Sequence, residues 1–177
     1  MVIKFDDYPD FKPDLTPEQM FRYGIVGGSY FRDIQSPITG KVYSDEDIKP
    51  FTFLNRISKD KLKSQNYNKE FNRFKVKAGS SYDYWIEKGW INEEDAHRGW
   101  IHWYCHFYNG RRSKDDIRQI RRWKNFASKT SGRFRIRFQN IINKLGVNNK
   151  DISPVIQQNL LEWGVDSTRM LPSSKDR

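Results

Sequence analysis

The sequence predicts a mainly α-helical protein with a single compact domain, and three observations support this fold class. The chain has 177 residues, a length that suits one domain. Capping and turn residues divide it into short amphipathic segments, and no stretch shows the strong alternation typical of strands. Aromatic residues make up 15% of the chain, so the core should be built on large rings. We expect one helical domain over residues 16–165, with room for a short hairpin or irregular loops in its first half.

The two ends of the chain are expected to lie outside this helical domain. Residues 1–15 predict an extended N-terminal arm, because Pro9 and Pro13 block regular structure. Residues 166–177 predict a flexible C-terminal tail. The first helix should begin after Thr16, since Pro17 and Gln19 complete a capping sequence, and should end near Gly24.

The remainder of the first half shows weaker signals. The glycines of "GIVGGSYFRDI" lack the spacing of a phosphate-binding loop, so a turn with close backbone packing is expected. Ser44 should cap a helix whose first turn holds the acids of residues 45–47, where they favour the helix dipole rather than a metal. Residues 58–79 predict a polar loop with some helix. Ser80 or Ser81 should cap a further helix that ends at Lys88.

Four helices are predicted in the second half of the chain. The first runs from about Glu93 to Asn109, and Gly110 ends it. The second is capped by Ser113 and ends at Gly132. The third covers residues 133–145 and stops at Gly146. The last opens at Ser153 with a proline in its first turn and closes at residues 163–164.

The first of these helices has an aromatic face. Trp100, Trp103, Tyr104 and Phe107 fall on one side of a helical wheel. A ring face at helical spacing is more often core than a base-stacking platform. We expect these rings to be buried, and to contact Trp123 or the last helix.

The opposite side of the same helix raises the question of a metal or a nucleophile. His102 and His106 are four residues apart and Cys105 lies near them, so one ion has up to three ligands there. A complete zinc motif is missing, however, and a reactive thiolate requires a neighbouring base. We expect surface or half-buried histidines, no bound metal and no cofactor.

Positive charge is concentrated in one segment. The formal charge is +10, and residues 111–137 alone contain eleven Lys and Arg against two Asp. Such a concentration favours a polyanionic partner, here DNA or RNA, contacted through the phosphate backbone. The cations around Arg118 and Arg122 are expected to form an exposed ridge with few acid partners. The candidate contacts are Arg111, Arg112, Lys114, Arg118, Arg121, Arg122, Lys129, Arg133 and Arg135.

The chain resembles a family of uncharacterised proteins of viruses and microbial eukaryotes. The resemblance rests on "GGSYFRDI", "EKGWINEEDAHRGWIHWYCHFYNGRRSKDDIRQIRRW", "GRFR" and "ISPVIQQNLLEWG", and covers roughly residues 20–165. It implies no activity. It leaves His102 and His106 outside the shared motif. The motif residues it implies are Trp103, Tyr104, Cys105, Arg111, Arg112, Asp116, Arg118 and Trp123.

Three functions fit these observations. The first is a nucleic-acid-binding protein that uses the arginine-rich helix. The second is a nucleic-acid-processing enzyme, either a nuclease or a base-processing enzyme, although no spacing of carboxylates singles out a catalytic group. The third is an interaction or assembly protein with a basic face. The lone Cys105, the lack of an 18-residue apolar run and the lack of a signal peptide lead us to expect a soluble protein in the cytoplasm or nucleus of a host cell.

Overall fold

Seven α-helices and one two-stranded hairpin form the regular structure of residues 2–173, the part of the chain that this computed structural model describes. The predicted mainly α class, including the hairpin, is confirmed. The hairpin is antiparallel and pairs Ile34 with Tyr43. The elements are α1 (Pro17–Tyr23), β1 (Ile34–Gln35), β2 (Val42–Tyr43), α2 (Lys59–Leu62), α3 (Tyr82–Glu87), α4 (Trp100–Tyr108), α5 (Asp116–Ala127), α6 (Arg133–Leu145) and α7 (Pro154–Glu162).

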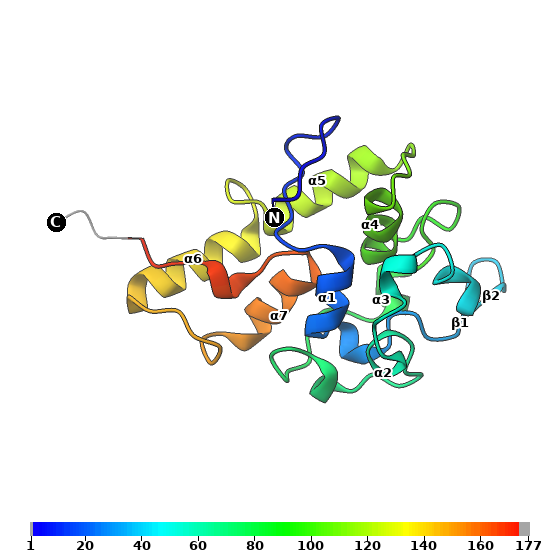
Figure 1. The fold of residues 1–177 in the computed structure, drawn as a ribbon, viewed down its shortest axis with the longest axis horizontal. Helices are drawn as coiled ribbons and strands as arrows, with labels where there is room; N and C mark the ends of the chain where they lie inside the picture. The colour runs from blue at the N-terminus through cyan, green and yellow to red at the C-terminus, as the bar shows by residue number, and fades with distance from the viewer. Residues whose placement is uncertain (1, 174–177) are drawn as a thin grey trace.

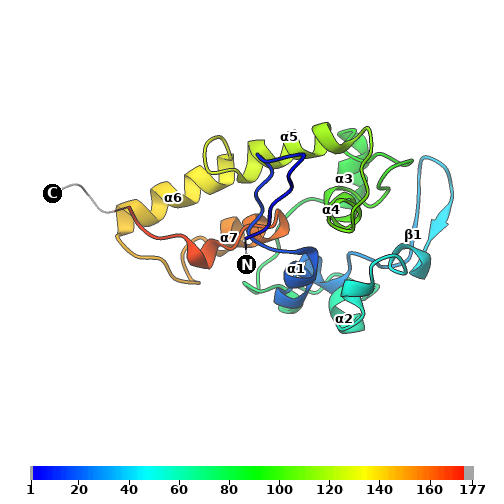
Figure 2. The same ribbon diagram turned by 45° about the horizontal axis from the view of Figure 1, so that its top comes forward.

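The helices are arranged in layers along an elongated molecule. Figure 1 shows α6 near one end of the long axis and the hairpin at the other. In Figure 2, α5 and α6 follow one another along one long edge, and α1 and α2 lie on the opposite side. Helix α4 packs against α1 and α5, and α7 packs against α6. The core therefore lies between the α5–α6 edge and the layer of α1 and α2.

The first helix begins and ends as its sequence predicts. The Thr16 hydroxyl accepts a hydrogen bond from the Gln19 N–H (3.2 Å), and the Gln19 side chain accepts one from the Thr16 N–H (2.9 Å). Gly24 follows the helix with φ 107°, and a Cβ placed there would lie 2.0 Å from the Phe71 carbonyl oxygen. Only glycine fits this position without a shift of the backbone.

The aromatic face of α4 is buried, as predicted. Trp103, Tyr104 and Phe107 have no exposed surface, and Trp100 and Trp123 are 6% and 2% exposed. The N-terminal arm contributes Phe11, whose ring centroid lies within 6.3 Å of all five of these rings. The arm is therefore irregular in backbone, but its apolar side chains complete the core.

Three predicted boundaries, in two helices, are wrong. Helix α4 begins at Trp100 rather than near residue 93, because Gly99 takes φ 98° and the preceding residues form a turn closed by an Asn92–Ala96 bridge. Helix α5 begins at Asp116 rather than Ser113 and ends at Ala127 rather than Gly132. The Asp116 carboxylate accepts from the Ser113 N–H (2.9 Å), which holds residues 113–115 in a turn before the helix.

Two further expectations need correction. Residues 45–47 form a single 3-10 turn, and Asp47 is buried instead of solvated at a helix end. The start of the predicted tail is packed, since Asp166, Ser167 and Met170 are buried and residues 167–169 form a 3-10 turn capped by Asp166. The last predicted tail residues, 174–177, lie outside the described residues. None of the helices described between residues 2 and 173 is long and apolar enough to cross a bilayer.

Candidate functional site

Several arginines of the basic segment bind acids of this same chain. Arg111 donates to Asp95 (2.9 Å) and Arg112 to Asp7 (2.7 Å). Arg118 donates to both carboxylate oxygens of the buried Asp115, at 2.6 and 2.9 Å. The expectation that these three side chains have few acid partners is therefore wrong.

Arg122 and Arg135 also have internal roles. The Arg135 side chain is largely buried, donates to the Ala127 carbonyl (3.3 Å) and lies 3.7 Å from the Asp14 carboxylate. The Arg122 guanidinium lies over the rings of Trp90 and Trp163, at 5.2 and 5.4 Å from their centroids. Burial lowers the pKa of Arg122 to about 10, which leaves it charged at neutral pH. Neither residue belongs to an exposed ridge.

The other predicted contacts do face solvent. Four of them, together with Arg137, are exposed and form no ion pair with an acid among residues 2–173. They follow the chain from the turn before α5 to the middle of α6. We call this set the exposed cations, and its members are Lys114, Arg121, Lys129, Arg133 and Arg137.

The histidines of α4 are not on the surface. His102 is only 2% exposed, which corrects the expectation of a surface or half-buried group, and His106 is half-buried. Burial lowers the pKa of His102 well below its ordinary value and that of His106 to about 4, so both rings are neutral at pH 7. Cys105 is fully buried, and burial raises the pKa of its thiol. These environments give no support to a reactive thiolate.

His102 instead faces Asp47 and His97, and the three side chains bring one possible ligand atom each within 4.8 Å of the others. The Asp47 carboxylate already accepts from the Arg98 Nε at 2.5 Å, and His97 Nε2 lies 2.7 Å from the same oxygen. The guanidinium supplies the positive charge that a metal ion would bring. We therefore assign this cluster to the packing of α4 and not to a metal.

A cavity of about 380 Å³ opens between α3, α4, α5, α6 and α7. Its walls are rich in indole rings: Trp85 comes from α3, Trp90 from the next loop, Trp100 from the start of α4 and Trp163 from the end of α7. Arg122 and Phe126 of α5 and Arg133 and Phe134 of α6 line the same space. We call it the aromatic cavity.

Glu162 is the carboxylic acid of this cavity. Its Oε1 accepts from the Val26 N–H (3.1 Å) and from the Gln158 amide (3.4 Å). Its Oε2 accepts no hydrogen bond from any described residue and faces Gly79, where a Cβ would lie only 3.3 Å away. Burial raises the pKa of Glu162 to about 7. The cavity thus holds an acid that changes protonation near neutral pH.

We expect Glu162→Gln to stabilise the protein at pH 8 and to have little effect near pH 5. The pKa of Glu162 is raised from 4.5 to about 7 in the folded chain. Folding therefore favours the protonated form, and the free energy of unfolding falls as pH rises from about 4.5 to about 7. Glutamine keeps the Oε1 acceptor and carries no charge. The gain at pH 8 should be on the order of 1–2 kcal/mol after allowance for partial exposure.

Urea denaturation at pH 5 and pH 8 measures this difference. Glu94→Gln, at an exposed glutamate, is the matched control and should leave the free energy of unfolding unchanged at both pH values. If the two variants change the free energy of unfolding alike, Glu162 does not have the raised pKa described above.

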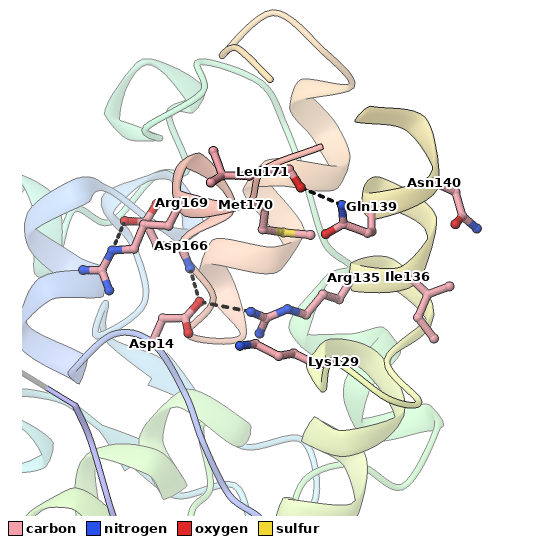
Figure 3. A pocket seen from close by; sticks show the side chains of 10 residues that line it. All are labelled: Asp14, Lys129, Arg135, Ile136, Gln139, Asn140, Asp166, Arg169, Met170 and Leu171. Carbon is pink, nitrogen blue, oxygen red and sulfur yellow. Dashed lines mark hydrogen bonds and ion pairs between the residues drawn. The ribbon is translucent and has the colours of Figure 1, made fainter. Parts of the chain in front are cut away.

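A second hollow of about 560 Å³ lies against α6, and half of its lining residues are charged. Figure 3 shows that these groups are directed toward one another: Asp14 accepts from the Asp166 N–H (3.1 Å) and faces Arg135, and Arg169 lies 3.2 Å from the Asp166 carboxylate. Because its acids and most of its cations pair within the chain, this hollow is assigned no ligand.

Comparisons with protein-family models, with curated proteins and with solved structures found no match.

Proposed function

We propose that the protein binds nucleic acid through the phosphate backbone, using the exposed cations of the α5–α6 edge. The observation that carries this proposal is the set of five solvent-facing Lys and Arg side chains without acid partners in the described part of the chain. Arg121 lies on α5, and Arg133 and Arg137 lie on α6, whereas Lys114 precedes α5 and Lys129 lies in the loop between the two helices. Helices α5 and α6 follow one long edge of the molecule (Figure 2). Phosphate neutralisation releases counterions, which makes such a surface attractive to any nucleic acid.

The proposal assigns different roles to the residues of the basic segment. Lys114, Arg121, Lys129, Arg133 and Arg137 contact phosphates. Arg111, Arg112, Arg118, Arg122 and Arg135 hold the helices and loops in place through the pairs described above. Arg118 and Arg122 in particular reach the Trp90 carbonyl, at 3.4–3.5 Å, and so fix the loop that bears one wall of the aromatic cavity.

The proposal predicts a salt-dependent affinity for a labelled 20-nucleotide strand or duplex, measured by fluorescence anisotropy. If about four cations contact phosphates, the log–log slope against salt should be about −3.6 for duplex DNA and about −2.8 for a single strand. Arg121→Glu/Arg137→Glu should weaken binding at least tenfold and reduce the slope by about two units. Both residues are exposed, so the melting temperature should stay unchanged.

Lys49→Glu/Arg56→Glu is the matched control, because it changes the net charge equally at exposed residues away from α5 and α6. This control should bind with a slope close to that of the wild type. An equal loss of affinity in both double variants would mean that binding depends only on the total charge of the protein. A folded wild type that binds neither DNA nor RNA would reject the proposal and favour an acidic protein partner.

A base-processing enzyme is the second candidate, and Glu162 is the observation that favours it. Its uncommitted Oε2 and a pKa of about 7 suit a general acid or base. A nuclease fits less well, since Asp115 binds Arg118 and Asp116 accepts from the Trp103 indole (2.9 Å). Release of a free base from an oligonucleotide without added metal, abolished in Glu162→Gln, would support this candidate.

A further inference from the structure

The aromatic cavity has a volume and a lining that suit a small flat ligand. Its volume of about 380 Å³ lies at the lower end of the range for ligand pockets. Trp163 stacks on Phe126 with centroids 4.8 Å apart, and Trp100 lies at the same distance from Trp163. Trp85 of α3 and Trp90 of its following loop line the same cavity. Walls made of aromatic rings favour a planar aromatic ligand.

The charges of the cavity exclude a cationic guest. The Arg122 guanidinium lies over Trp90 and Trp163, and the Arg133 guanidinium lies 4.8 Å from the Phe126 centroid. The ring faces that would hold an ammonium group are thus already next to two positive charges. The Glu162 carboxyl offsets at most one of them. A ligand that joins a flat ring to an anion complements this site.

The cavity also offers groups for the polar edge of such a ring. The Glu162 Oε2 is free of hydrogen bonds from the described residues and can accept from an amino group or, when protonated, donate to a ring nitrogen. Asn159 lines the same wall, and only its Nδ2 is engaged, donating to the Val155 carbonyl (3.0 Å). Carboxyl and amide side chains commonly form hydrogen bonds with the edge of a nucleobase.

The cavity is continuous with the phosphate-binding edge proposed above. Arg133 is both an exposed cation and a lining residue. A strand that follows α5 and α6 would therefore pass the mouth of the cavity with its phosphates on the outside.

We infer that the aromatic cavity binds one unpaired nucleobase of the nucleic acid, stacked on Trp85 beside Trp90 and Trp163, with Glu162 and Asn159 at its edge. This inference rests on the proposed function, because the exposed cations hold the strand to which the base belongs. It assigns the protein a preference for single-stranded or locally unpaired nucleic acid. A base in a regular duplex cannot enter the cavity.

The test compares a labelled 12-nucleotide strand with a strand of equal length built from abasic sugar phosphates, in deoxyribose and ribose forms. Stacking contributes about 1–3 kcal/mol per base, so the strand with bases should bind about 5–150-fold more tightly. It should also quench tryptophan fluorescence. Trp85→Ala and Asn159→Phe, the first removing a wall and the second filling the space, should each bring the two affinities within about twofold.

Phe53→Ala is the matched control, because this half-buried ring packs on Phe51 and Tyr108, away from the cavity. It should keep the preference for bases. Equal wild-type affinity for both strands would overturn the inference while leaving salt-dependent phosphate binding, and hence the proposed function, intact. Binding of neither strand would reject both. A preference for bases that survives in both folded cavity variants would place the base elsewhere and also overturn the inference.

Discussion

Trp103→Ala is expected to lower the free energy of unfolding by about 3–5 kcal/mol, the usual cost of removing a large aromatic side chain from a core. Trp103 has no exposed surface, and its ring centroid lies 4.9 Å from that of Phe107 and 5.5 Å from that of Phe11. The substitution also removes the indole N–H that donates a hydrogen bond to the Asp116 carboxylate. Chemical denaturation monitored by circular dichroism measures the loss.

Two variants separate the contributions to this effect. Trp103→Phe keeps a ring in the core but lacks the N–H donor, so it should cost less than Trp103→Ala. Ile117→Ala, at a side chain of α5 that is 62% exposed, should change stability little. If Trp103→Ala were no more harmful than Ile117→Ala, the core would not be built around the aromatic face of α4.

The helices and their caps were largely predictable, because the signals are local. The residues around Thr16 form both reciprocal hydrogen bonds of a capping box. Gly146 follows α6 in the left-handed conformation, with φ 70°. The ring face of α4 needed only helical periodicity. Each of these features depends on residues within a few positions of one another.

The partners of the arginines were not predictable in the same way. Asp7 and Arg112 lie far apart in the sequence, and they meet only because the N-terminal arm folds back beside α5 (Figure 1). Asp95 reaches Arg111 because residues 92–96 form a turn rather than the first turn of a helix. A sequence shows how many charges a segment carries but not which charges face one another.

The aromatic cavity was missed for a related reason. Its walls come from segments that are far apart in the chain, and no local motif joins Trp85 to Trp163. One signal was available: Glu162 is the only charged residue of α7, next to Leu160, Leu161 and Trp163. An acid within an apolar helix is either paired or has a raised pKa, and here burial raises the pKa.

The internal pairs also decide which variants test function. Charge reversal at Arg118 and Arg122 would place new acids beside the buried Asp115 and release the loop that carries Trp90. Loss of nucleic-acid binding in that variant would follow from disruption of the fold. Arg121 and Arg137 avoid this ambiguity, because both are exposed and neither forms an ion pair within residues 2–173.

Asp47→Ala is expected to lower the free energy of unfolding by about 3–5 kcal/mol at pH 7, because it leaves a buried cation without its partner. Arg98 is 2% exposed and donates to Asp47 at 2.5 Å, while its Nη1 donates to the carbonyls of Tyr30 and Arg32. These contacts fix the segment before α4 against the segment that leads into the hairpin. Asp45→Ala, at an exposed acid two residues earlier, is the control and should cost far less.

The pH dependence of this difference provides an independent check. Burial raises the pKa of Asp47, but the hydrogen bonds from His97 and Arg98 and the charge of Arg98 together outweigh it and lower the pKa from 3.8 to about 2. Because the folded pKa is depressed, the stabilising contribution is fully present above about pH 4 and is lost as pH falls through about 2. The gap in free energy of unfolding between wild type and Asp47→Ala should therefore narrow as pH falls below 4. A gap that is small at pH 7, or that does not narrow in acid, would show that the Asp47–Arg98 pair does not hold these two segments together.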